Sequence, residues 1–395
     1  MTSVLVVDDS QFMRTVIGNL LSDHGYEVYS ARDGEQALDA VEKHDPDIVT
    51  MDVVMPGVDG IEAVERIMKR QPTPILMLSA HTKEGADATF EALSKGAVDF
   101  LAKPGGEVSV DIGSLEDRLV ETVDAVADAD LTSIARERTA ETATSVASTA
   151  AADSETVTSG ASTGANQPDG PESTTSSPST PAGPKTVPRP TESDRTYVDR
   201  PTVIIGASTG GPKIVEQVLA KLPADLDARV LVVQHMPASF TDRLAARLDS
   251  VLEYDVSEAS DGDRVDGGEI LIAKGESHLE ISHYVNGRVR VRLTKKQRVH
   301  GVRPAIDVTM QTAADRIDDP IVGVVCTGMG KDGAAGIEAI AEAGGHTIAQ
   351  DRTTSPVFGI PQQAIATGAV NDVLPAEDIP GGILDALSMD GDTNG

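Results

Sequence analysis

Ser208 lies in a turn whose neighbouring residues suit a nucleophile. The turn has the sequence Gly206-Ala207-Ser208-Thr209-Gly210 and follows the apolar run 203–205. It matches G-x-S-x-G, in which small neighbours leave a serine hydroxyl accessible between a strand and a helix. A P-loop requires lysine where this chain has Pro212, and a dinucleotide-binding loop requires glycine at position 208. The turn alone leaves two interpretations open, because serine at such a position is also a common helix N-cap.

A nucleophilic serine needs a general base, and the base needs an orienting acid. His235 follows the apolar run 230–233, and Asp332 follows the apolar run 321–326. Because the carboxyl ends of parallel strands meet at one edge of a sheet, we expect both side chains to lie near Ser208. The loop 327–330, which precedes Asp332, is suited to aim backbone N–H groups at a developing oxyanion. None of the other histidines combines a preceding apolar strand with a position at this edge.

A second set of polar side chains points to phosphoryl transfer. The set follows four apolar runs near the start of the chain and comprises Asp8, Asp9, Asp52, Ser79 and Lys103. Three carboxylates in one crevice repel one another unless a hard cation such as Mg²⁺ lies between them. A carboxylate beside Mg²⁺ can accept a phosphoryl group, whose charge Lys103 would offset and whose oxygens the Ser79 hydroxyl would hydrogen-bond.

The order of predicted elements indicates an α/β protein with two domains and a linker. In residues 1–122, five strands alternate with five helices, which predicts a doubly wound parallel sheet. In the first helix, apolar residues from Phe12 to Leu21 are expected to face the core, with Ser10 as the N-cap. Residues 123–199 are polar and are expected to form a disordered linker. Residues 200–390 resume the alternation, with an antiparallel hairpin predicted around Asn286-Gly287.

The charge of the chain limits its partners. The formal net charge is −30, which argues against nucleic-acid binding, since such proteins need a basic surface. An acidic binding surface or an acidic linker would explain part of this excess. We favour a third explanation, a salt-rich cytoplasm in which screening makes self-repulsion tolerable.

Other features of the chain favour a cytoplasmic protein that is not itself a membrane protein. We find no apolar run long enough to span a bilayer, and the first residues do not resemble a signal peptide. Cys326 is the only cysteine, so no internal disulfide can form. Its apolar surroundings predict a buried structural thiol.

Residues 1–122 resemble the receiver domain of response regulators. The matching stretches are "VVDDS", "DIVTMDVVMPGVDG", "LMLSA" and "FLAKP". The resemblance implies that Asp52 is phosphorylated by a histidine kinase. It also implies Mg²⁺ ligands from Asp9, Asp52 and the Val54 carbonyl, with Asp8 acting through water. The positions implied in the conformational switch are Ser79, Phe100 and Lys103.

Residues 200–378 resemble the catalytic domain of the chemotaxis protein-glutamate methylesterases, the CheB family. The matching stretches are "IGASTGG", "QHMP", "RPAIDV", "TGMGKDGAAG" and "TIAQD". The resemblance implies a triad of Ser208, His235 and Asp332, with Met329 and Thr209 at the oxyanion hole. No metal or cofactor is implied at this site. The order of the triad differs from that of the α/β-hydrolases, so that superfamily is not expected.

The implied activity is hydrolysis of glutamate methyl esters on methyl-accepting chemoreceptors, with deamidation of receptor glutamines. A chemotaxis histidine kinase would be the phosphodonor. Lys331 stands where the family commonly has asparagine, and the linker is longer than usual. The alternative is a response regulator whose second domain docks on receptors without catalysis. In that case Ser208 would be only a helix cap.

Overall fold

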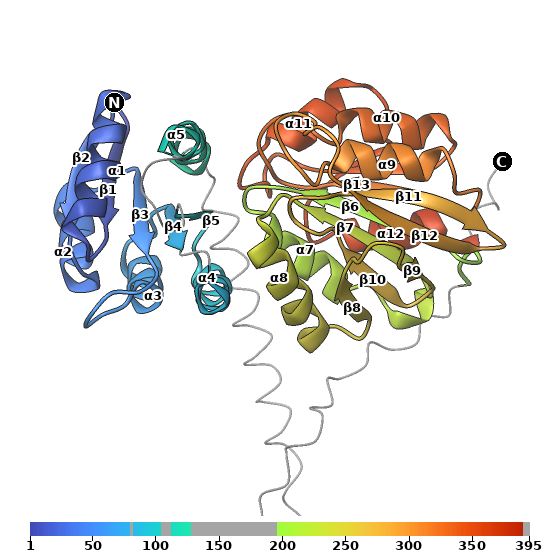
Figure 1. Cartoon of the computed structure of the whole chain (residues 1–395), viewed down its shortest axis with the longest axis horizontal. Coiled ribbons are helices and arrows are strands. Elements are labelled where there is room, and N and C mark those ends of the chain that lie inside the picture. The colour runs from blue at the N-terminus through green and yellow to red at the C-terminus, as the bar shows by residue number, and fades with distance from the viewer. Residues whose placement is uncertain (80–81, 104–111, 128–195, 390–395) are drawn as a thin grey trace, which may run out of the picture. The chain divides into compact units, whose positions relative to one another are not determined.

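The computed structural model describes residues 1–79, 82–103, 112–127 and 196–389 (Figure 1). Residues 128–195, which make up most of the predicted linker, lie outside the described residues. The N-terminal and C-terminal domains are each built around a parallel sheet. Within the described ranges, no helix is long and apolar enough to cross a membrane.

The N-terminal domain contains the predicted five-stranded parallel sheet. Its strand order is β2-β1-β3-β4-β5. The strands β3 and β4 are buried along their whole length, as expected for a sheet covered on both faces. The strands are β1 (Ser3–Val7), β2 (Glu27–Ala31), β3 (Ile48–Asp52), β4 (Ile75–Ser79) and β5 (Asp99–Ala102).

Five helices connect and follow these strands, as predicted. The Met13 N–H donates to Ser10 Oγ at 3.4 Å, which confirms Ser10 as the first N-cap. Phe12, however, is 57% exposed, because the buried stripe is centred on Ile17, Leu20 and Leu21. The helices are α1 (Gln11–Asp23), α2 (Gly34–His44), α3 (Gly60–Arg70), α4 (Lys83–Lys95) and α5 (Ile112–Ala127).

The C-terminal domain contains a seven-stranded parallel sheet with the order β15-β14-β13-β6-β7-β10-β8. Its strands are β6 (Thr202–Ala207), β7 (Arg229–Gln234), β8 (Asp255–Glu258), β10 (Glu269–Ile272), β13 (Ile321–Val325), β14 (His346–Gln350) and β15 (Asp372–Leu374). The strands β13, β6 and β7 are neighbours, so the three chain segments that follow them leave the sheet side by side.

A separate antiparallel sheet contains the predicted hairpin. It consists of β9 (Arg264–Val265), β11 (His278–Val285) and β12 (Arg288–Thr294). Between β11 and β12, Asn286 and Gly287 have φ values of 52° and 76°. Two successive positive φ angles are those of a type I′ turn, which matches the right-handed twist of a hairpin.

Alternate residues of the parallel strands pack against two different layers of helices. Val203 and Ile205 belong to one buried cluster, and Ile204 belongs to the other. Figure 1 shows α9, α10 and α11 along one face of this sheet and α7 and α8 along the other. The helices are α7 (Gly211–Ala220), α8 (Ala238–Val251), α9 (Ile306–Ala314), α10 (Ala334–Glu342), α11 (Gly359–Ala366) and α12 (Ile379–Leu387), with a 3₁₀ turn η1 (Ala224–Leu226).

Cys326 directly follows β13 and is fully buried. Burial raises the pKa of its thiol to about 12, so it is un-ionised at neutral pH. The predicted structural role for this cysteine agrees with both observations.

Candidate functional site

Ser208 lies at the end of β6, in the turn that leads into α7. Its N–H donates to the Thr327 carbonyl at 3.0 Å. Its own carbonyl accepts from the Gly211 N–H and from Gln234 Nε2, both at 2.8 Å. The N-cap of α7 is Gly210, with a φ of 74° and no side-chain cap hydrogen bond. Ser208 is therefore not the N-cap of this helix, which argues against the interpretation of the turn as a helix cap.

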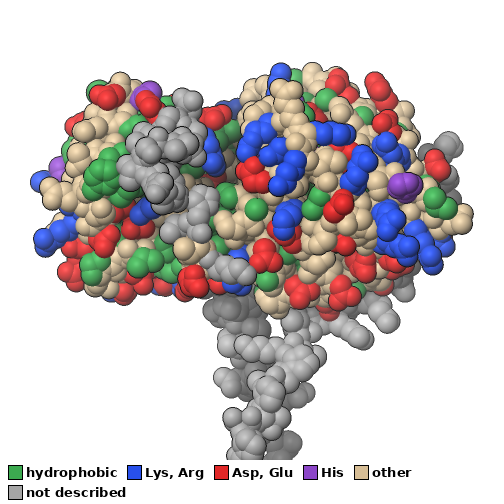
Figure 2. Space-filling view, in the orientation of Figure 1, with side chains coloured by type: hydrophobic (Ala, Val, Ile, Leu, Met, Phe, Trp, Pro, Cys, Tyr) green, Lys and Arg blue, Asp and Glu red, His purple; other side chains and the backbone are tan. Residues whose placement is uncertain are grey.

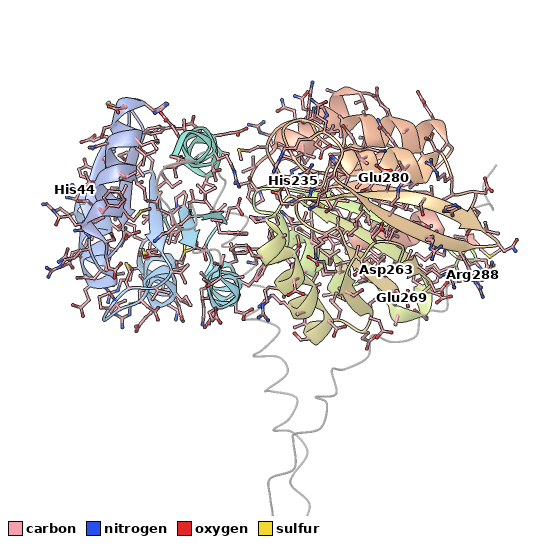
Figure 3. The ribbon with its side chains drawn as sticks, viewed as in Figure 1. His44, His235, Asp263, Glu269, Glu280 and Arg288 are labelled. Atoms are coloured by element: carbon pink, nitrogen blue, oxygen red, sulfur yellow. The ribbon has the colours of Figure 1, made fainter. Side chains whose placement is uncertain are left out.

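His235 and Asp332 meet at the same edge of the sheet. His235 Nε2 and Asp332 Oδ2 are 2.7 Å apart, and their side chains are 10% and 3% exposed. The His235 N–H donates to the Ala207 carbonyl at 3.0 Å, which places His235 beside the Ser208 turn. Figure 3 shows His235 near the ends of β6 and β7, at the side of the domain opposite Arg288.

Asp332 is a buried carboxylate held by several donors. Besides His235, it accepts hydrogen bonds from the N–H groups of Ile306 at 2.7 Å and Asp307 at 3.1 Å, at the start of α9. Burial by itself would raise the pKa of Asp332. The hydrogen bond and charge of His235, together with these N–H groups, outweigh burial and lower the pKa below its usual value. Asp332 is therefore ionised and suited to orient an imidazole.

The loop before Asp332 packs closely on the serine turn. Thr327 Oγ1 donates to the Thr209 carbonyl at 2.9 Å. A Cβ placed on Gly328, which has a φ of 158°, would lie 2.6 Å from Ser208 Cβ, so only glycine fits there. The Gly328 carbonyl also accepts the Ile360 N–H at 2.7 Å. This packing places Met329 and Thr209, the predicted oxyanion donors, in segments adjacent to Ser208.

Two residues of this site were not identified from the sequence. They are Asp307, which lies within "RPAIDV", and His300, which follows no apolar strand. His300 Nε2 and Asp307 Oδ2 are 2.9 Å apart, next to Asp332. Asp351, the acid at the end of the matching stretch "TIAQD", does not contact the triad. Its carboxylate instead accepts hydrogen bonds from Thr353 and Thr354.

The polar residues predicted at the edge of the N-terminal sheet also come together. Asp8, Asp9 and Asp52 each offer an oxygen within 4.8 Å of the others. Lys103 Nζ is 2.8 Å from Asp8 Oδ2 and 2.7 Å from Asp52 Oδ1. Burial raises the pKa of Asp52, while the hydrogen bond and charge of Lys103 oppose that change. Three carboxylates with one lysine form an oxygen-rich donor set that fits Mg²⁺.

The remaining predicted residues of this domain lie around that cluster. Ser79 is buried at the end of β4, and its hydroxyl donates to the Gly85 carbonyl at 3.0 Å. Phe100 lies in β5 in register with Met77, with its ring 6.5 Å from that of Phe90. Val54 follows β3 and is 72% exposed.

Comparisons with known proteins agree with both halves of the chain. Residues 203–383 match the model of the CheB methylesterase family, and residues 4–110 match that of the response regulator receiver domain. The chain is 51% identical to a protein-glutamate methylesterase/protein-glutamine glutaminase of Haloarcula marismortui, with 98% of each chain covered. It is 49% identical to the protein of that name from Halobacterium salinarum, over 98% of this chain and 99% of the relative. For a relative of the same name from Pyrococcus horikoshii the identity is 41%, over 98% of this chain and 94% of the relative.

Proposed function

Because this chain belongs to the protein-glutamate methylesterase/protein-glutamine glutaminase family, we propose that it hydrolyses glutamate methyl esters on chemoreceptors and releases methanol. By the same chemistry it deamidates receptor glutamines and releases ammonia. The observation that carries the proposal for the site is the hydrogen bond between His235 and Asp332 beside the turn of Ser208. Both reactions serve chemotactic adaptation, in the cytoplasm where the kinase and the receptor segments lie.

The reaction begins at Ser208. Since Nε2 of His235 is bound to Asp332, Nδ1 is the nitrogen left to accept the serine proton. Ser208 Oγ bonds to the side-chain carbonyl carbon of the substrate, and the imidazolium then gives its proton to the departing methoxide. A water molecule, deprotonated by His235, hydrolyses the acyl-enzyme and restores Ser208. Asp332 holds the imidazole in one tautomer and stabilises its charged form.

The oxyanion formed in each half-reaction needs donors at fixed positions. The close packing between Gly328 and Ser208 and the bond from Thr327 to Thr209 support a hole formed by the backbone N–H groups of Met329 and Thr209. Such groups stabilise the developing charge without reorganisation, which is usually the largest single contribution to catalysis. No metal or cofactor is part of the proposed esterase mechanism.

The N-terminal domain would control this reaction by phosphorylation of Asp52. Asp8, Asp9, Asp52 and the Val54 carbonyl would hold Mg²⁺, which when bound offsets the charge of the incoming phosphoryl group. Lys103, already within 2.7 Å of Asp52, would pair with the phosphoryl oxygens. Ser79 and Phe100 would then change position as the switch, with a chemotaxis histidine kinase as the phosphodonor.

A serine-directed fluorophosphonate probe and a methanol-release assay test the proposal together. The folded chain is expected to be labelled and to release methanol from methylated receptor membranes, and Ser208→Ala is expected to lose both. Ser250→Ala is a matched control, because that hydroxyl is exposed on α8, where it donates to the Arg247 carbonyl. A folded wild-type chain that is neither labelled nor active would support the non-catalytic docking module instead.

A further inference from the structure

A second pair of histidine and carboxylate lies directly behind Asp332. His300 Nε2 is 2.9 Å from Asp307 Oδ2, and the two side chains are 30% and 4% exposed. One polar atom from each of His300, Asp307 and Asp332 lies within 4.8 Å of the other two. This pair therefore extends from the buried acid of the proposed triad to the solvent.

Asp332 bonds the start of α9, which contains Asp307, and Asp307 bonds the start of α10, which follows Asp332. Asp332 precedes α10, and its oxygens accept the N–H groups of Ile306 and Asp307 at the start of α9. Asp307 lies in the first turn of α9, and its Oδ1 accepts the N–H groups of Gly333 and Gly336, each at 2.8 Å. The first N–H groups of a helix lack partners within it, so the two carboxylates satisfy both helix starts reciprocally. The position of Asp332 therefore depends on Asp307.

The charges around Asp307 fit this arrangement. Burial and the negative charge of Asp332 raise the pKa of Asp307, whereas the Gly336 N–H and the bond to His300 act in the opposite direction. Two adjacent buried carboxylates are unfavourable unless donors and a cation compensate them. The two helix starts provide donors, and His300 Nε2 lies 2.9 Å from the other oxygen of Asp307.

We propose that Asp307, supported by His300, is a positioning residue for the esterase reaction. Its hydrogen bonds to Gly333 and Gly336 hold the segment that carries Asp332 against α9. This contact fixes Asp332 and, through it, the orientation of the His235 imidazole. The inference rests on the proposed triad of Ser208, His235 and Asp332. Asp307 is not a catalytic residue in this scheme, because it acts on the reacting groups only through Asp332.

The test compares Asp307→Ala with Asp307→Asn in the full chain. The alanine variant loses both bonds to the start of α10, and we expect kcat to fall about 100-fold, the usual consequence of a displacement of about 1 Å in a catalytic group. KM should not change, because substrate contacts are retained. Asparagine keeps an oxygen that can accept the Gly333 and Gly336 N–H groups. The kcat of Asp307→Asn should therefore be at least tenfold higher than that of Asp307→Ala.

A spectroscopic measurement separates positioning from a general structural role. Proton NMR of histidine-labelled protein is expected to show a downfield signal for the proton between His235 Nε2 and Asp332, and Asp307→Ala should lose or shift it. Asp372→Ala is a matched control, since it removes another histidine–carboxylate pair, with His346 Nε2 2.6 Å from Asp372 Oδ2. The control should keep both the signal and the wild-type kcat.

The outcomes distinguish this inference from the proposed function. Wild-type kcat and an unchanged signal in Asp307→Ala would overturn the inference while leaving the esterase activity intact. A wild-type chain without activity whose signal still depends on Asp307 would overturn the function alone. Should Asp307→Ala not fold, His300→Ala retains all four helix-start bonds and is expected to lower kcat about threefold to tenfold, the range of a modest coupling free energy. No change of kcat or signal in His300→Ala would then contradict the inference.

Discussion

Asp332 determines how the His235 imidazole is held, because it bonds Nε2 of that ring at 2.7 Å. Asp332→Asn keeps the size of the side chain but removes the charge that favours the required tautomer. We expect kcat to fall about 10⁴-fold, as for loss of the corresponding acid in a comparable triad. Receptor-based methanol release measures this change, with Asp351→Asn as a control that should retain wild-type turnover. Near-normal turnover in Asp332→Asn would show that another acid orients the base.

Asp9 provides a separate test of the N-terminal site. Its carboxylate lies within 4.8 Å of those of Asp8 and Asp52 and belongs to an exposed residue, so Asp9→Asn should not disturb folding. We expect this variant to lose Mg²⁺ binding in calorimetry and to stop forming an aspartyl phosphate from a small phosphodonor. Chelation of Mg²⁺ should have the same effect on the wild type. Phosphorylation that persists in both experiments would rule out the proposed ligand set.

At the scale of residues, the sequence predicted the positions that follow strands and missed those that act through the backbone. Ser208, His235 and Asp332 each follow a parallel strand, and this alone predicts one common edge. Asp307 is different, because its partners are N–H groups of Gly333 and Gly336. Every residue except proline carries a backbone N–H, so these partners leave no pattern of side chains in the sequence. Only the packing of α9 on α10 identifies them.

Among the elements, β6 illustrates how closely the sheet and α9 approach one another. A Cβ on Gly206 would lie 2.4 Å from Ile306 Cγ2. Because the Ile306 N–H bonds Asp332, Gly206→Ala should move the start of α9 and with it the acid of the triad. We expect a loss of about 1–3 kcal/mol in the free energy of unfolding and a fall in kcat of about 10- to 100-fold. Thermal unfolding and methanol release measure the two effects.

Gly323→Ala is the matched control for this prediction. Its Cβ would lie 2.6 Å from Ile340 Cδ1 of α10, so it should also reduce stability. Ile340 bonds neither Asp332 nor His235 in the described structure, and kcat should remain near the wild-type value. Equal losses of kcat in both variants would mean that loss of stability, and not displacement of Asp332, explains the effect of Gly206→Ala.

The predicted order of strands and helices was confirmed in both domains, including the hairpin at Asn286-Gly287. Alternation of apolar runs and turn residues is local information, and it was sufficient for this result. The strand order β15-β14-β13-β6-β7-β10-β8 was not predicted, because it depends on pairing between distant segments. The prediction that Phe12 faces the core was wrong for a related reason. Helical spacing shows which apolar residues share one face of a helix, but the neighbouring elements determine which of those residues are buried.

For the whole molecule, net charge is the property with the clearest consequence. The chain has 33 basic and 63 acidic residues, a formal net charge of −30, and Figure 2 shows acidic side chains spread over much of the visible surface. The haloarchaeal relatives support the prediction that the protein works in concentrated salt. The Debye length falls from about 10 Å at 0.1 M to about 3 Å at 1 M. We therefore expect the melting temperature, followed by circular dichroism, to rise steadily between 0.1 and 2 M KCl. A melting temperature independent of salt would contradict this explanation of the acidic composition.

The proposed control of Ser208 by phosphorylation of Asp52 involves both domains. The two residues lie at the edges of different sheets, and the predicted linker is too polar to pack as a connecting element. Coupling therefore has to pass through an interaction between the domains, which a few kcal/mol of differential binding can switch. We expect the unphosphorylated N-terminal domain to repress the esterase and phosphorylation to relieve that repression.

This model predicts different behaviour for two variants in a methanol-release assay with and without a small phosphodonor. A chain that starts at Arg200 should be active without the phosphodonor and should not respond to it. Full-length Asp52→Asn should remain at the basal rate when the phosphodonor is added. A long linker lowers the effective concentration of each domain for the other, so the response of the wild type should be smaller than in relatives with short linkers. If the segment from Arg200 is no more active than the unphosphorylated full chain, repression is the wrong model. Phosphorylation would then have to act by stimulating the esterase or by recruiting it to receptors, and adding the phosphodonor to receptor membranes would separate those two effects.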